Sequence, residues 1–444
     1  MKAEKGISMN KPKMVVIGAG SIFFTRAVTI GMCRDDHYRG GTLSLVDTNP
    51  EMLDVMARLC RRIIQEMGAD LRVEATIDRK QVLVGAGFVV LSFSNKGVDL
   101  RATETQIPAR YGIIQSSGDS TGPGGIFRAI RTIPTVLEVA RDIERLCPQA
   151  WVFNYINPTS IVGAALARHT RLKTLALCDG VLLPDKKLEL MDRVGIPRDQ
   201  TDSVYLKMGG INHFSWVTEF RRDQEDLLPK LFQQLKNSPE AHGSRAVEQL
   251  FEVFGYYSAI GGHMVEFVPY FQGRGTQPEA SFVSHVFEID ERRKWMREFN
   301  AEIRRQAAGQ EPITRLINET KPDLVIRIAN TIMDDSGDIH YVNLPNQGNI
   351  TNLPAGAIVE VPARIYADRC VGEVFGDLPI VLRSWILRVI DVQELTLQAA
   401  MTGDRRLLRQ ALVADALTVS IEDADRIIDD LFKAEGDDIP SIWR

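Results

Sequence analysis

The chain has 444 residues, of which 44% are hydrophobic and 25% charged, enough for two packed domains and too apolar for a largely disordered protein. Its formal net charge of -5 leaves no basic surface of the kind that binds nucleic acid or an anionic membrane, so small molecules are the expected partners. The 5 cysteines are scattered, which favours free thiols in the reducing cytoplasm over a disulfide framework.

The N-terminus predicts a strand, a tight turn and a helix. Residues 1–12 contain scattered lysines and no apolar core, so we expect a disordered leader rather than a signal peptide. The apolar run 14–17 then meets a Gly-Ala-Gly-Ser turn and a helix-compatible segment that begins near Phe23. Glycine permits the sharp turn and lets the backbone approach a pyrophosphate, whose charge suits the N–H groups at a helix start. The residues expected at the cofactor here are Gly18, Gly20, Ser21 and Ile22.

A second apolar strand, residues 43–47, ends in Asp47. A carboxylate at this place can accept hydrogen bonds from the adenosine ribose, and it favours NAD over NADP. Asn95, after a later strand, is a further candidate for cofactor binding. The alternative is that Gly18 and Gly20 only shape the turn and that Asp47 caps the next helix.

Short apolar runs alternate with helical patterns along the first half of the chain. The runs are residues 88–91, 151–153 and 174–177, and residues 127–146 form a helical pattern between two of them. This rhythm predicts βαβ units and a mainly parallel sheet. Since ligands gather at the carboxyl ends of parallel strands, the polar residues after these runs should converge on the cofactor crevice. These residues are Ser92 to Asn95, Asn157, Cys178 and Asp179.

The pattern changes beyond the first 203 residues. Strand-like runs at 324–326 and 357–361 precede a long helical C-terminus from about 380 to 432. The predicted fold class is therefore α/β, with an N-terminal Rossmann domain that has a mainly parallel sheet over residues 13–203 and a mixed α+β domain over residues 204–444. We expect the second domain to carry substrate, metal and oligomer contacts.

Two further features indicate a site. The glycine-rich loop from Ser116 to Arg131 implies a backbone shaped around a ligand, and an ordinary connection between strand and helix is the alternative. Cys178 and His213 offer a soft and a borderline metal ligand, and a thiolate with an imidazole binds a divalent transition ion well. Taken alone, His213 could equally be a core histidine and Cys178 a buried thiol.

A series of short motifs follows one order along nearly the whole chain. They are the turn at 18–21, Arg101 ahead of residues 104–108, residues 121–125 and 129–134, Asn157-Pro158, Cys178, Asn212-His213, and residues 346–348, 352–354 and 359–362. In these motifs the chain resembles glycoside hydrolase family 4, the NAD- and Mn-dependent glycosidases built on a lactate-dehydrogenase-like fold.

The resemblance implies a mechanism that differs from the paired-carboxylate hydrolysis of most glycosidases. NAD oxidises C3 of the sugar, a base removes the proton at C2, the glycosidic oxygen leaves by elimination, water adds, and the hydride returns. In this family a cysteine and a histidine bind the divalent metal, which implies Cys178 and His213 as ligands of Mn2+ or another transition ion.

The resemblance also implies roles for three residues near the metal. The base in several relatives is a tyrosine, which makes Tyr257 the first candidate and Tyr256 the second, and the alternative is that both rings simply pack. Asp179 matches the general acid of the phospho-α-glucosidase branch. Gly180 stands where that branch has a methionine, and this departure weakens both the role of Asp179 and the assignment to the branch.

The substrate positions imply an α-linked hexoside with an acidic group. Arg101 and Asn157 match substrate-contacting positions of the family, and Arg274 could pair with a carboxylate, phosphate or sulfonate, or lie solvated at the surface. Galacturonides and glucuronides come ahead of 6-phosphoglucosides and sulfosugar glycosides. The alternatives are a NAD-dependent dehydrogenase of sugars or hydroxy acids and a non-catalytic nucleotide sensor. Relatives commonly assemble, so a homodimer or homotetramer is expected.

Overall fold

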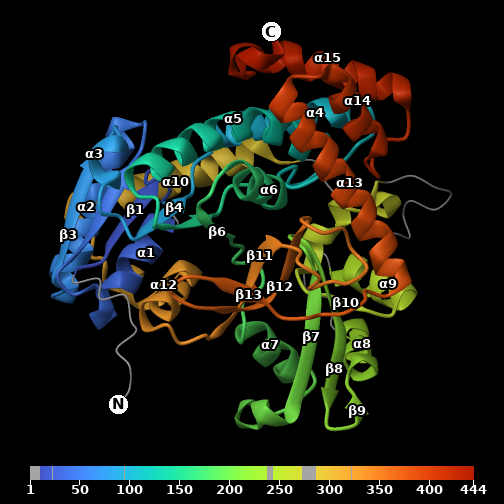
Figure 1. The fold of residues 1–444 in the computed structure, drawn as a ribbon, viewed down its shortest axis with the longest axis horizontal. Helices are drawn as coiled ribbons and strands as arrows, with labels where there is room; N and C mark the ends of the chain where they lie inside the picture. Colours follow the sequence, from blue (N-terminus) through green and yellow to red (C-terminus); the bar gives the residue numbers. More distant parts are fainter. Residues whose placement is uncertain (1–10, 23, 95, 238–243, 273–286, 322) are drawn as a thin grey trace.

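The computed structural model describes residues 11–22, 24–94, 96–237, 244–272, 287–321 and 323–444. Within them the chain forms an α/β fold, with a parallel sheet in the N-terminal part and a mixed arrangement in the C-terminal part (Figure 1). The predicted fold class is confirmed.

The N-terminal part contributes the parallel half of the sheet. Its strands, in spatial order, are β3 (Leu71–Thr76), β2 (Gly41–Val46), β1 (Lys13–Ile17), β4 (Phe88–Leu91), β5 (Trp151–Asn154) and β6 (Lys173–Ala176). Five of these strands coincide with the apolar runs of the sequence. Strands β2, β4 and β5 are buried along their whole length, as expected for parallel strands that helices cover on both faces.

The C-terminal part extends the same sheet with antiparallel strands. These are β7 (Val204–Ile211), β8 (Phe214–Arg222), β9 (Glu225–Asp226), β10 (Tyr257–Ser258), β11 (Ile339–Pro345), β12 (Ile358–Ile365) and β13 (Cys370–Gly372). The halves join where Asn343 of β11 lies opposite Ala176 of β6. Across β12, Glu360 lies opposite Asn343 on one side and Gly210 of β7 on the other. The two predicted domains therefore share one sheet, and their boundary at residue 203 stays a prediction.

Helices flank this sheet. They are α1 (Phe24–Cys33), α2 (Pro50–Met67), α3 (Lys80–Leu83), α4 (Gly97–Ala109), α5 (Gly122–Leu146), α6 (Thr159–His169), α7 (Asp185–Arg193), α8 (Leu228–Asn237), α9 (Ser244–Phe254), α10 (Ile289–Ala307), α11 (Thr314–Glu319), α12 (Leu324–Asp334), α13 (Ile380–Thr402), α14 (Arg405–Ala414) and α15 (Ile421–Glu435). The predicted helical C-terminus is confirmed as α13 to α15, which pack on α4, α5 and α6 (Figure 1). None of the helices in the described residues combines the length and apolarity that crossing a membrane requires.

Two local expectations are wrong. Residues 324–326, read as a strand, begin helix α12, because Asp323 caps its start by accepting the N–H of Val325 at 3.0 Å. The buried residues of this helix recur with a helical period, which a window of three apolar residues cannot reveal. The loop expected from Ser116 to Arg131 ends early, since α5 starts at Gly122.

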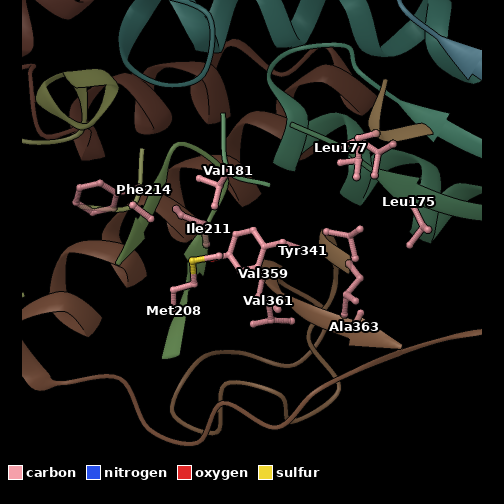
Figure 2. Packing of buried hydrophobic residues seen from close by; sticks show 14 of the residues in the cluster. Leu175, Leu177, Val181, Met208, Ile211, Phe214, Tyr341, Val359, Val361 and Ala363 are labelled. Atoms are coloured by element: carbon pink, nitrogen blue, oxygen red, sulfur yellow. The ribbon is translucent and has the colours of Figure 1, made fainter. Parts of the chain in front are cut away.

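The main hydrophobic core continues across the junction of the two halves. Leu175 of β6 and Leu177, just beyond it, belong to the same cluster as Tyr341, Val359 and Val361 of β11 and β12, and Figure 2 also shows Met208 and Ile211 of β7 in this cluster. Because this core is continuous, the carboxyl end of β6 and the end of β7 are held at a fixed distance. These two strand ends carry the predicted metal ligands.

Candidate active site

The predicted cofactor turn closes around Asp47. The N–H of Gly20 donates to Asp47 Oδ2 at 2.7 Å, and the N–H of Asn49 donates to Oδ1 at 2.8 Å. A Cβ at Gly20 would lie 2.8 Å from Asp47 Oδ2, so glycine is required here by the carboxylate itself. Gly18 has φ +96°, and a Cβ there would lie 2.6 Å from the backbone nitrogen of Phe93. Both glycines therefore serve close packing at the ends of β1, β2 and β4.

This turn fits a dinucleotide. A carboxylate oxygen carries more than one lone pair, so Asp47 can still accept hydrogen bonds from ribose hydroxyls after binding two backbone N–H groups. Ser21 is half-buried in the turn. Ile22 is 3% exposed and packs in the apolar cluster between α1, α2 and α10, so its side chain supports the turn from the protein side. Asn95 lies outside the described residues.

Cys178 lies directly beyond strand β6. The backbone N–H of Gly180 donates to its sulfur at 3.4 Å, and the side chain of Asn212 lies close enough to the thiol to act on its pKa. Burial raises the pKa of Cys178 to about 12, with a further contribution from the nearby negative charge of Glu360. A thiol in these surroundings has to release its proton before it can bind a metal ion.

His213 lies in the two-residue turn between β7 and β8, where Ile211 pairs with Phe214. Its φ is +61°, a conformation that such turns require and that histidine adopts more readily than most residues. Its Nδ1 lies 2.9 Å from Ser120 Oγ, which fixes the ring and leaves Nε2 for a ligand. Because Asn212, the residue before His213, lies beside the Cys178 thiol, the turn brings the imidazole close to the thiol.

The loop before α5 adds a carboxylate that the sequence reading missed. Asp119 Oδ2 accepts Nδ2 of Asn157 at 3.3 Å and lies 4.0 Å from Nη2 of Arg101. Burial opposes its charged form, but three neighbours outweigh burial and hold the pKa of Asp119 well below its usual range. These neighbours are Arg101, His213 and Arg128. Arg101 and Asn157, both predicted at the substrate, thus meet at one anionic group beside His213, a predicted metal ligand.

Glu266 and His263 also border this site. Glu266, which is 4% exposed, accepts the backbone N–H groups of Ser117 at 2.5 Å and Gly118 at 2.9 Å, and so clamps the loop that presents Asp119. The ring of His263 lies 4.9 Å from that of His213, centroid to centroid. Burial and the neighbouring His213 lower the pKa of His263.

The donor set fits a divalent transition ion. Cys178 supplies a sulfur, and His213 supplies a nitrogen whose ring is oriented from its other side by Ser120, the arrangement typical of histidine ligands. In the part of the chain that the structure describes, no three His, Cys, Asp or Glu side chains cluster closely enough to hold a metal. Two protein ligands would leave coordination positions for substrate oxygens.

Asp179 lies beside another carboxyl group, that of Asp323. Crowding by protein around its carboxyl and the charge of Asp323 raise the pKa of Asp179 to about 7. Tyr155 donates a short hydrogen bond to Asp323. Asp179 also lines a polar cavity of about 390 Å³ together with Lys186 and Lys321. A carboxyl that keeps its proton near neutral pH next to an open cavity can act as an acid.

The predicted tyrosines differ in their surroundings. Tyr257 is 4% exposed, and its ring centroid lies 5.9 Å from that of Phe251. Burial raises its pKa, and the charges that act on it are those of Arg193 and Glu189 of α7. These contacts favour the packing alternative for Tyr257. Tyr256 is half-buried at the edge of the same core. Arg274 lies outside the described residues.

Comparison with known proteins agrees with this geometry. Two family models match the chain, family 4 glycosyl hydrolase over residues 13–194 and the family 4 glycosyl hydrolase C-terminal domain over residues 208–418. An α-galactosidase of Bacillus subtilis is 30% identical over 438 residues, covering 96% of this chain and 99% of that protein. An α-galacturonidase of the same organism is 29% identical over 451 residues, covering 96% and 98%.

A solved structure shares the fold. The 6-phospho-α-glucosidase from gut microorganisms, in complex with NAD and Mn2+, superposes with a TM-score of 0.82 at 19% identity and covers 97% of this chain and 99% of its own.

Proposed function

Because the chain belongs to glycosyl hydrolase family 4, we propose that it is a NAD- and divalent-metal-dependent glycosidase that acts on an α-linked hexoside with an acidic group. The observation that carries the proposal is the turn at Asn212 and His213, which joins Cys178 to the loop of Ser120. The solved relative that binds NAD and Mn2+ supports the choice of cofactors. The family membership favours the hydrolase over a dehydrogenase or a nucleotide sensor.

The proposed chemistry assigns work to residues of both halves. When bound, NAD supplies a reversible hydride acceptor and the metal supplies a Lewis acid for the sugar oxygens. Asp47 binds the adenosine ribose, and Cys178 and His213 hold the metal. Asp179 gives its proton to the leaving glycosidic oxygen, on the side of the cavity lined by Lys321. The aglycone would leave through that cavity.

The base at C2 is proposed to be a tyrosine. Tyr256 is half-buried, whereas Tyr257 has the contacts of a core residue, so we place Tyr256 first. Tyr256→Phe should abolish exchange of the substrate C2 hydrogen with deuterated solvent, and Tyr257→Phe should lower thermal stability more than it lowers exchange. The opposite pattern would return the role to Tyr257.

Charge near Arg101 supports an acidic substrate. Arg101 is electrostatically coupled to two carboxylates, Asp119 and Glu266, and to two further guanidinium groups, Arg128 and Arg292. An anionic substituent at C5 or C6 of the sugar would be attracted to these guanidinium groups. A hexuronide is the proposed substrate, in agreement with the relative named α-galacturonidase.

The test is release of nitrophenol from α- and β-linked nitrophenyl hexosides, hexuronides and 6-phosphohexosides and from a nitrophenyl sulfoquinovoside. Each assay is run under reducing conditions with NAD and Mn2+ added or withheld. Release that requires both, without accumulation of NADH, supports the elimination mechanism, and the best substrate identifies the acidic group. Stoichiometric NADH from a free sugar or hydroxy acid, with no glycoside cleaved, would contradict the proposal.

The proposed assembly is a homodimer or homotetramer in the cytoplasm. Sedimentation of the purified protein measures its mass directly, and a monomer at micromolar concentration would refute the proposed assembly.

A further inference from the structure

Glu360 is a carboxylate inside an apolar strand. It lies in the middle of β12, where its neighbours Val359 and Val361 are fully buried, and it is itself only 1% exposed. No step of the proposed reaction uses it. Burying a carboxylate is costly unless its charge is compensated, so its presence requires a reason.

The hydrogen-bond partners of Glu360 are all neutral. Its Oε1 accepts Nδ2 of Asn212 at 3.2 Å and Nδ2 of Asn343 at 3.0 Å. Its Oε2 accepts the hydroxyl of Ser215 at 2.6 Å. Among the described residues, Glu360 forms no ion pair with any lysine, arginine or histidine; the ion pairs that do form lie elsewhere in the fold. Neutral donors compensate a buried negative charge only in part.

The sheet register places Glu360 between the two strands that lead to the predicted metal ligands. One row across the sheet runs from Ala176 of β6 through Asn343 and Glu360 to Gly210 of β7. Strand β6 leads to Cys178 and strand β7 leads to His213. The apolar side chains around the row, among them Tyr341, Val359 and Ile211, exclude water (Figure 2).

Asn212 links the carboxylate to the thiol. Its side chain donates a hydrogen bond to Glu360 and lies beside the Cys178 thiol, and it is the residue next to His213. An outer carboxylate that orients ligands and balances the charge of an ion is a recurrent part of protein metal sites. The contact with Asn212 places Glu360 where such a carboxylate would lie.

We propose that Glu360 is a positioning residue of the metal centre: it holds the Asn212 side chain against Cys178 and supplies the buried negative charge that a divalent ion at Cys178 and His213 balances. The inference rests on the proposed function, since it presumes a metal at these two side chains. It differs from that function in assigning metal affinity to a residue that touches neither the metal nor the substrate.

The test compares Mn2+ binding by the metal-free wild-type protein and by Glu360→Gln, measured by calorimetric titration with manganese chloride alone. The substitution keeps the size of the side chain and removes its charge. We expect the Kd for Mn2+ to rise by about 10-fold to 100-fold, while NAD affinity stays at the wild-type value. A purely structural role would instead lower the melting temperature of the metal-free protein and leave the Kd unchanged.

Glu435→Gln is the matched control, because Glu435 is a glutamate 3% exposed on helix α15, away from the metal ligands. It should bind Mn2+ as the wild type does. Equal Mn2+ affinity of Glu360→Gln and the wild type overturns the inference, and so does an equal loss in both variants. If Glu360→Gln fails to fold, Asn212→Ala is the second test, because it removes the side chain between Glu360 and Cys178 and keeps the charge of Glu360. Weaker Mn2+ binding by Asn212→Ala supports the inference, and unchanged Mn2+ binding overturns it. A wild-type protein that binds no Mn2+ overturns both the inference and the proposed function.

Discussion

Replacing Gly20 with alanine should weaken NAD binding and leave the protein folded. The new Cβ would lie 2.8 Å from Asp47 Oδ2, and ordinary contact begins at 3.4 Å, so the carboxylate has to retreat by 3.4 − 2.8 = 0.6 Å. That movement stretches the bonds from the N–H groups of Gly20 and Asn49, now 2.7 and 2.8 Å. A hydrogen bond to a charged group contributes roughly 1.5–3 kcal/mol.

Loss of one such bond in the geometry that binds the ribose corresponds to a rise of about 10-fold to 100-fold in the Kd for NAD. Titration of the purified protein with NAD measures it, and thermal denaturation checks the fold. Gly163→Ala is the control, because its Cβ would meet the nearest atom, the Cβ of Ala176, at an ordinary 3.4 Å. Wild-type NAD affinity in Gly20→Ala would refute the role of Asp47 as ribose acceptor.

Three further predictions concern the metal, the substrate and the C-terminal helix. Cys178→Ser should lower Mn-stimulated turnover by about 100-fold or more while NAD still binds. Unchanged turnover would contradict the role of Cys178 as a metal ligand. Arg128→Gln should lower kcat/KM for a hexuronide by about 10-fold and spare the neutral hexoside, with Arg128→Lys as the charge-retaining comparison; equal losses on both substrates would contradict the charge argument. Arg131 is buried between two glutamates. Its Nη2 lies 2.5 Å from Oε1 of Glu104, and its Nε lies 3.8 Å from Oε2 of Glu435. Burial raises the pKa of Glu104 to about 7 and that of Glu435 to about 8, from the ordinary 4.5. Between pH 4.5 and pH 8 the folded protein therefore holds protons on these two glutamates that the unfolded chain has released. Their contribution to the free energy of unfolding is fully present below pH 4.5 and declines as the pH rises towards 8. Glu435→Gln should make this decline smaller and stabilise the protein at pH 9 relative to the wild type by on the order of 2 kcal/mol. Denaturant unfolding at pH 6 and pH 9 measures the difference. An equal decline in both proteins would show that the two glutamates do not titrate in this range.

Local sequence patterns were sufficient for the strands that are continuous apolar runs and for the long helices of residues 122–146 and of the C-terminus. The apolar runs at 14–17 and 88–91 became β1 and β4 because a strand buried on both faces needs only a continuous apolar segment. The run at 324–326 misled for the same reason, since its helical period appears only when Ile328 and Ile332 are included. Three residues cannot separate the two periods.

The site residues that the sequence predicted are reactive or polar side chains within recognisable motifs. The site residues that it did not predict depend on partners that lie far away in the sequence. Asp119 stands within the glycine-rich run, but its importance comes from Arg101 and Asn157, which lie far from it in sequence. The bond from Ser120 to His213 spans 93 residues. Glu360 did carry a local signal, because a single acid between buried valines departs from the pattern of a core strand. That signal shows that the acid is unusual and does not say what it serves.

The order of the strands explains why such residues are needed. Strands β6 and β7, which lead to Cys178 and His213, are separated in the sheet by β11 and β12. Three steps of about 4.8 Å place the two strands about 14 Å apart, too far for a thiol and an imidazole to share one ion from the strands themselves. The turn after β7 must therefore lean over β12, and the side chain of β12 that hydrogen-bonds this turn is Glu360. A change of register in β12 would move Glu360 to the other face of the sheet, and Asn212 would lose its anchor together with the contact to Cys178.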